Sequence, residues 1–154
     1  MDKETRIKYF DNLTSAPNSA YGSMEVWYKN RRQKLDVYEI DLEYLLYNPY
    51  NGRIASLVKS YEKQNGRTLD PSDQEDKKMI EGFLWESNIS SNKTTKQSLK
   101  DHKQLKYGIV TKDGVIIDGN RRAILLNEIY REDNENPRYF LGVVLNETLE
   151  ENAK

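Results

Sequence analysis

The first third of the chain changes from helical to extended spacing of its apolar residues. Residues 2–13 carry apolar side chains at helical intervals, which predicts a short helix that ends before Pro17. Residues 37–40 read as a strand. Residues 41–47 are a compact apolar segment, predicted to be a turn or a short helix that ends where Pro49 excludes the α conformation from the residue before it.

Two helices are predicted in the middle of the chain. From Ile54 the apolar residues fall at spacings of three, four and seven, and Asn65-Gly66 supplies a stop signal. A second helix is expected over residues 72–87, since Ser72 and Glu75 have the spacing of a capping box and an apolar stripe follows them.

The next segment predicts a loop, a third helix and a hairpin. The polar residues 88–93 are expected to form the loop, and Thr94 or Thr95 would then cap a helix that runs to about Lys103. Residues 107–111 and 115–118 are β-rich and flank Lys112-Asp113-Gly114, which is a turn signal. Two short antiparallel strands are therefore expected.

After the hairpin the pattern becomes helical again. A helix should open around Asn120, one residue beyond the strand that ends at Asp118. Residues 134–137 read as a loop, residues 139–145 as a last strand, and residues 147–154 as the start of another helix. The predicted fold class is α+β, with a small mixed sheet surrounded by helices.

Composition limits the chemistry that this fold can carry. The 154 residues are enough for one domain, and 16 aromatic residues favour a folded chain. The absence of cysteine excludes disulfides, thiol catalysis and cysteine metal sites, and one histidine excludes a multi-histidine metal site. The net charge of −1 provides no overall positive field for nucleic acid, so any DNA contact must be local. No signal peptide or membrane span is recognisable, so we expect a cytoplasmic protein.

The junction between the strand and the helix at residues 118–122 is the richest chemistry in the chain. Gly119 allows backbone amides to approach a ligand, and a helix N-terminus favours anions. The positive charges of Arg121 and Arg122 are unfavourable at the positive end of the helix dipole unless an anion neutralises them. The alternative is that one of them pairs with Asp118 and only closes the turn. Asp118 itself could orient Arg121, which we favour, or hold magnesium through water.

Two basic clusters leave alternatives open. The first is a row of lysines along one face of the third helix, which could contact DNA phosphates or simply be solvated: Lys93, Lys96, Lys100 and Lys103. The second follows Trp27 and Tyr28, whose rings could stack on a base but are more simply expected in the core: Lys29, Arg31, Arg32 and Lys34.

The segment Val115–Leu125 resembles the Gly-X-X-Arg box of the ParB/sulfiredoxin superfamily, in which a strand runs into a phosphate-binding turn and a helix. Upstream, the segment 40–53 is similar to an earlier box of that family, which ends in an Asn-Pro-X-X-X-Arg pattern. Residues 139–145 match the strand that follows the helix. The resemblance extends from Val37 to Asn146.

The resemblance implies that the chain binds a nucleoside triphosphate, ATP or CTP. Five residues would then line the site of its phosphates: Gly119, Asn120, Arg121, Arg122 and Arg53. Asn48 and Pro49 would shape the loop beside them, and magnesium would accompany the nucleotide. By this resemblance residues 37–154 form a ParB-like domain with a helical insertion over about 54–103, and residues 1–36 form an N-terminal extension.

The chain also departs from the family. Asn120 stands where the clamp-type ParB proteins have a glutamate and where sulfiredoxin has its catalytic cysteine, so sulfiredoxin chemistry is excluded. The family's Glu-Asn-X-X-Arg box has only a faint echo in Glu151-Asn152. We therefore expect a nucleotide switch or slow NTPase in a DNA-linked process, as a homodimer or with further domains. The alternatives are a non-enzymatic module of the same fold that binds DNA or a protein, and a ParB-like nuclease.

Overall fold

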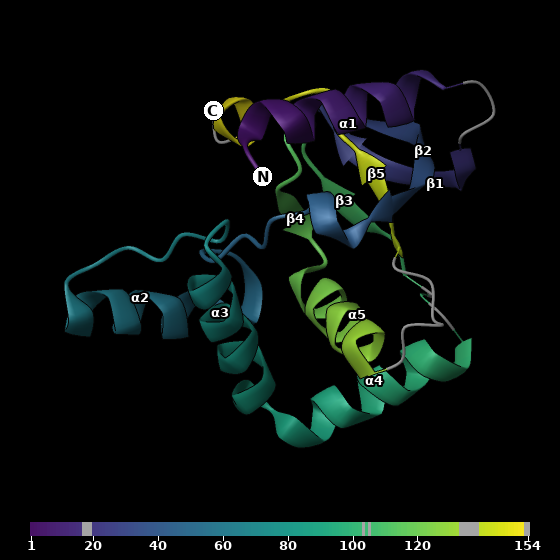
Figure 1. Cartoon of the computed structure of the whole chain (residues 1–154). Coiled ribbons are helices and arrows are strands. Elements are labelled where there is room, and N and C mark those ends of the chain that lie inside the picture. The colour runs from purple at the N-terminus through teal and green to yellow at the C-terminus, as the bar shows by residue number, and fades with distance from the viewer. Residues whose placement is uncertain (17–19, 103, 105, 133–138, 153–154) are drawn as a thin grey trace.

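The computed structural model describes residues 1–16, 20–102, 104, 106–132 and 139–152, apart from the side chain of Arg53. Helices and strands alternate irregularly along the chain (Figure 1). In order, the elements are α1 (Lys3–Ser15), β1 (Ala20–Tyr28), β2 (Arg31–Asp41), the 3-10 turns η1 (Leu42–Tyr44) and η2 (Gly52–Ile54), α2 (Ala55–Asn65), α3 (Gln74–Ser87), α4 (Ile89–His102), β3 (Gly108–Val110), β4 (Ile116–Asp118), α5 (Asn120–Glu132), β5 (Tyr139–Val144) and α6 (Leu149–Asn152).

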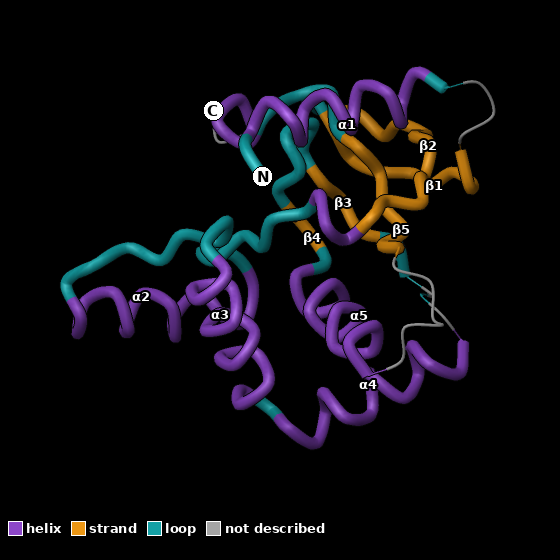
Figure 2. Tube along the Cα trace, in the orientation of Figure 1, coloured by secondary structure: helices purple, strands orange, loops and turns teal. Residues whose placement is uncertain are grey.

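The strands, drawn in orange in Figure 2, form one mixed sheet in the order β1-β2-β5-β3-β4. β3 and β5 run parallel, and the other neighbouring pairs are antiparallel. The parallel pair needs a long crossover, and α5 lies within it. The predicted α+β class with a small mixed sheet is confirmed.

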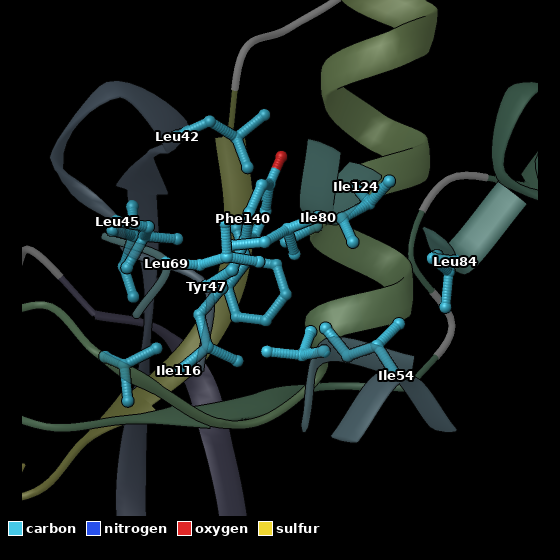
Figure 3. Packing of buried hydrophobic residues seen from close by; sticks show 14 of the residues in the cluster. Leu42, Leu45, Tyr47, Ile54, Leu69, Ile80, Leu84, Ile116, Ile124 and Phe140 are labelled. Carbon is cyan, nitrogen blue, oxygen red and sulfur yellow. The ribbon is translucent and has the colours of Figure 1, made fainter. Parts of the chain in front are cut away.

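One large apolar core lies between the sheet and the helices. In Figure 1, α1 lies across the sheet near the top of the view, and α2, α3, α4 and α5 lie below it. Phe140 and Ile116 reach the core from strands, and Ile80, Leu84 and Ile124 reach it from α3 and α5 (Figure 3). Because these side chains are almost wholly removed from water, their burial is the main force that holds the helices on the sheet.

The opposite face of the sheet carries a smaller apolar cluster. Val37 and Val143 are paired across β2 and β5 and are fully buried, and Leu145 joins them. Residues of a strand alternate between its two faces, so β2 supplies Val37 to this cluster and Tyr38 to the large core.

Most predicted elements are present, and two helix starts are corrected. The α3 N-cap is Asp73, whose carboxylate accepts the Asp76 N–H at 3.0 Å, rather than Ser72. Residues 88–93 are not a loop, since α4 begins at Ile89 and not at Thr94 or Thr95. Asn88 caps it by accepting the Ser91 N–H at 3.0 Å. The loop predicted over 134–137 lies outside the described residues.

The N-terminal segment 1–36 is built into the fold. β1 and β2 form a hairpin, of which the sequence predicted only a strand over residues 37–40. The predicted boundary between the N-terminal extension and the domain, after residue 36, falls inside β2. Phe10 of α1 lies in the large core with about 1% of its surface exposed. Segment 1–36 therefore contributes to both the sheet and the core rather than extending from them.

Both ends of the chain meet at the turn between β3 and β4. Arg6 of α1 donates from Nε to the Asp113 carbonyl at 3.0 Å, and the Leu149 N–H donates to the Asp113 carboxylate at 3.1 Å. The N and C marks lie close together in Figure 1. Among the described residues, no helix has the length and apolar character needed to cross a membrane.

Candidate functional site

The strand–turn–helix junction has the geometry that the sequence suggested. β4 ends at Asp118, α5 begins at Asn120, and Gly119 alone connects them with a φ of +121°. A Cβ atom at Gly119 would lie 2.6 Å from the Phe140 ring. Position 119 therefore requires glycine both for its backbone angle and for space.

Two loops far apart in the sequence are joined at this junction by paired amides. The Asn120 side chain accepts the Asn48 N–H at 2.9 Å and donates to the Asn48 carbonyl at 2.7 Å. Asn51 donates from its side chain to the Ile117 carbonyl of β4. The loop after Asn48 is thus held against the N-terminus of α5, which brings together the two sequence boxes.

A pocket of about 380 Å³ lies between these two loops. Ile54 and Leu84 give it apolar walls, while Lys106, Arg121 and Arg122 contribute cations to its lining. The first turn of α5 faces the same space, and the backbone amides at a helix N-terminus carry partial positive charge. Cations and helix dipole together make this pocket suited to an anion.

Arg122 is the least satisfied side chain of the pocket. Its side chain is 18% exposed, and its Nε and Nη2 atoms are buried without a hydrogen-bond partner. The Asp118 carboxylate lies 3.7 Å from Nη2, which makes an ion pair but is too long for a hydrogen bond. A buried guanidinium that lacks acceptors is costly, so an incoming oxyanion would relieve that cost.

Arg121 is used differently from its neighbour. Its guanidinium donates to the side chains of Asn92 at 2.9 Å, Ser91 at 2.7 Å and Thr95 at 2.8 Å, all on α4. Arg121 therefore fastens α5 to α4 at the border of the pocket. The expected pairing of Asp118 with Arg121 is also corrected, because Asp118 pairs with Arg122 instead.

The lysine row of α4 does not form a common free surface. Lys96 contacts Glu128 at 3.2 Å and Glu132 at 2.6 Å on α5, and Lys100 lies 3.6 Å from Glu132. Lys93 is exposed, and Lys103 lies outside the described residues. Two of the four lysines suggested for DNA are therefore already matched by carboxylates within the chain.

Four of the five predicted phosphate-site residues line the pocket: Gly119, Asn120, Arg121 and Arg122. The predicted loop residue Asn48 does not line it but holds Asn120 by hydrogen bonds. The backbone of Arg53 lies in η2, beside the pocket residues Gly52 and Ile54, while its side chain is outside the described part of the chain. Sequence reasoning missed Lys106, which follows α4 at a position without any motif.

The metal chemistry of the site is limited to one carboxylate. In the described ranges no three residues among His, Cys, Asp and Glu gather as a metal site would require. Asp118 lines the pocket and is half exposed. A magnesium ion here would therefore need ligand oxygens from a bound phosphate and water, which is a common arrangement for this ion.

Searches with the whole chain found no matching family model, no matching curated protein and no matching solved structure. Conclusions about function therefore rest on the geometry of the pocket and on the residues that line it.

Proposed function

We propose that the pocket at the start of α5 binds the phosphate groups of a nucleoside triphosphate, ATP or CTP. The observation that carries this proposal is Arg122, which lines the pocket and whose guanidinium has two buried nitrogens without a hydrogen-bond acceptor. Phosphate oxygens are the acceptors that a planar guanidinium binds best.

The surroundings of Arg122 support a phosphate ligand. The first turn of α5, whose amides carry partial positive charge, lines the same space, and Lys106 adds a point charge to the lining. Gly119 lines the pocket with its backbone alone, and a Cβ atom there would collide with the Phe140 ring. A volume of about 380 Å³ falls within the usual range for small-molecule sites.

The same proposal includes a ParB-like fold for the nucleotide-binding part of the chain. Its support is the junction of the two boxes through Asn48 and Asn120, and the crossover from β4 through α5 to β5. When present, magnesium would neutralise phosphate charge, and Asp118, which lines the pocket, would be the protein carboxylate available to hold it. The chain's own residues bind and orient the phosphates, while Arg121 keeps its hydrogen bonds to side chains of α4.

Binding is proposed as the primary activity, with the chain acting as a nucleotide-dependent switch or slow NTPase in a DNA-linked process. Arg121 supports the switch, because a ligand at α5 would act on a residue that holds α4 through three hydrogen bonds. Hydrolysis would require a positioned water and stabilisation of phosphoryl charge, for which the arginines are the candidates.

Thermal unfolding tests the proposal directly. The native chain is melted with ATP, CTP, GTP, UTP and inorganic triphosphate, each with and without magnesium. A ligand at about 100 times its dissociation constant adds about 2.7 kcal/mol to the unfolding free energy, which corresponds to an increase in Tm of roughly 5–10 °C. We expect that increase with at least one nucleotide, and expect Arg122→Gln to abolish it.

The control is Lys63→Gln, which removes an exposed cation from α2 that does not line the pocket. It should retain the full increase. The proposal fails if none of the ligands raises the Tm of the native chain, or if Arg122→Gln responds as the native chain does.

A further inference from the structure

The β1–β2 hairpin carries an aromatic and basic surface that the pocket does not use. Trp27 is 74% exposed, which corrects the expectation that its ring anchors the core. Four exposed cations lie on the turn and on the neighbouring strand, and Arg32 and Lys34 share the face of Trp27: Lys29, Arg31, Arg32 and Lys34. We propose that this hairpin surface binds single-stranded nucleic acid by stacking a base on Trp27 and by binding phosphates through the neighbouring cations.

The strand register places the main groups of this surface on one face. Trp27 lies directly opposite Arg32, and Glu25 lies directly opposite Lys34. Side chains opposite each other in an antiparallel pair share a face and lie about 5 Å apart at Cβ. The indole therefore has a guanidinium beside it and an ammonium two residues farther along β2.

The other face of the same hairpin explains why Trp27 points to solvent. Val26 is buried, and Met24, Tyr28 and Leu35 pack against the smaller apolar cluster. Because strand residues alternate between faces, the inward positions of β1 are taken by Met24, Val26 and Tyr28. Trp27 thus contributes little to the core. Packing does not explain a tryptophan at this exposed strand position, where a smaller polar residue would serve.

The hairpin projects beyond its neighbour in the sheet. β2 pairs with β5 from Val37 to Asp41, whereas residues 31–36 pair with β1 alone among the described strands. Lys29 and Asn30 form the turn with φ values of +53° and +62°, as expected of a tight hairpin connection. This geometry gives a two-stranded ribbon with a basic end.

The cations of the ribbon are available to a ligand. Arg32 and Glu25 lie 3.9 Å apart, and their side chains are 76% and 66% exposed. Such a surface ion pair is weak and is screened by salt, so phosphate can replace Glu25 at little cost. By contrast, Lys96 on α4 is 14% exposed and is held between two glutamates.

The ring and the charges together favour a single strand. In a duplex the faces of the bases are covered by stacking, whereas an unpaired base can lie on an exposed aromatic ring. A membrane surface fits less well, because Trp27 and Tyr21 are the large apolar side chains exposed on β1 and interfacial binding needs a broad apolar area. Single strands of DNA and of RNA both offer unpaired bases and phosphates, so the test includes both.

The experiment measures fluorescence anisotropy of labelled 15-nucleotide strands of deoxythymidine and of uridine, with a duplex of equal length and vesicles containing phosphatidylserine as comparisons. We expect the native chain to bind at least one single strand at low salt and more tightly than the duplex. Stacking is worth enough that Trp27→Ala should weaken binding roughly 5- to 100-fold. Arg32→Gln should reduce the magnitude of the slope of log K against log salt by about 0.7.

Two controls separate this surface from other parts of the chain. Lys63→Gln removes an exposed lysine from α2 and should leave oligonucleotide binding unchanged. Arg122→Gln tests the alternative that the oligonucleotide occupies the pocket at the start of α5 instead of the hairpin. A circular dichroism melt of Trp27→Ala measures whether its fold is retained, and we expect a native-like Tm because the side chain is exposed.

The outcomes are decisive for the hairpin. The proposal is overturned if the native chain binds neither strand at low salt, if Trp27→Ala binds as the native chain does, or if only the vesicles are bound. Loss of binding in Arg122→Gln with normal binding in Trp27→Ala would assign the oligonucleotide to the pocket and also overturns it.

Discussion

Arg121 and Arg122 are adjacent in sequence but have opposite relations to the rest of the molecule. Arg121 gives its hydrogen bonds to α4, where Asn92 is 1% exposed and accepts from Nε. Arg122 keeps two buried nitrogens without acceptors. One residue therefore stabilises the folded chain, and the other reduces its stability in the absence of a ligand.

This difference predicts opposite effects of the same substitution. Arg122→Met should raise the unfolding free energy by about 1 kcal/mol, because a buried donor without a partner is removed. Arg121→Met should lower it by about 2 kcal/mol, since the Asn92 carbonyl oxygen loses its donor inside the protein. Urea denaturation of the two variants and the native chain measures both changes. Equal destabilisation by the two substitutions would contradict the distinction.

The sequence could predict the residues of the pocket better than their roles. The junction could be located from local sequence alone, because a glycine separates a strand pattern from a helix pattern and two arginines follow it. Which arginine faces α4 depends on Asn92, Ser91 and Thr95, and the sequence analysis placed two of these in a loop. The Asn48–Asn120 amide pair spans 72 residues, and no local pattern indicates its hydrogen bonds.

At the scale of elements, helix starts were the weakest part of the prediction. Asn88 and Asp73 are good N-caps, but Thr94, Thr95 and Ser72 are equally acceptable by residue type. The choice is made by packing, since Asn92 must reach the Leu84 carbonyl at 2.8 Å and the Trp85 carbonyl at 3.1 Å. The β1–β2 hairpin was missed for a related reason, because its turn is Lys29-Asn30 rather than a glycine-containing pair.

The segment between α2 and α3 is fixed by one carboxylate. Asp76 accepts two hydrogen bonds from Arg67, at 2.8 and 3.1 Å, and a third from the Asp70 N–H at 2.9 Å. These bonds, first of all those from Arg67, lower the pKa of Asp76 below its ordinary 3.8. The ionised form is therefore favoured by folding.

The consequence is a loss of stability in acid. Above about pH 5 the folded and unfolded states both hold Asp76 ionised, and its stabilisation is complete. As the pH falls below about 5 the unfolded state takes up a proton first, and that stabilisation is progressively lost. Asp76→Asn should lower the Tm at pH 7 and make its decline between pH 4 and pH 2 shallower. Glu86→Gln, at an exposed position of the same helix, is the control and should match the native Tm at pH 7. A native-like decline in Asp76→Asn would contradict this role.

At the scale of the whole molecule, the turn at Asp113 connects elements from the two ends of the chain. Asp113 is 5% exposed and accepts from the Thr111 hydroxyl at 2.6 Å as well as from the Leu149 N–H. Its carbonyl accepts from Arg6. From the sequence, Asp113 was only the middle of a turn signal, since its partners are 36 and 107 residues away.

Removing this carboxylate should affect both stability and the C-terminal region. Asp113→Ala leaves the Thr111 hydroxyl and the Leu149 N–H without their acceptor, so the unfolding free energy should fall by about 2–3 kcal/mol. Limited proteolysis should then cut near Leu149 sooner than in the native chain. Asp11→Ala, at an exposed position on α1, should change neither property. Unchanged cleavage and stability in Asp113→Ala would show that the Asp113 carboxylate does not hold the C-terminal segment.

The position of β1 at the end of the strand order has a consequence for how copies of the chain behave toward one another. Within the described residues β1 pairs with β2 alone, so one side of a nine-residue strand presents unpaired backbone groups. Such an edge is a template for association between copies, and proteins commonly protect it with charge. Lys29, Arg31 and Arg32 supply that charge at one end. The same cations that suit the hairpin to a polyanion therefore also act as a barrier against edge-to-edge aggregation.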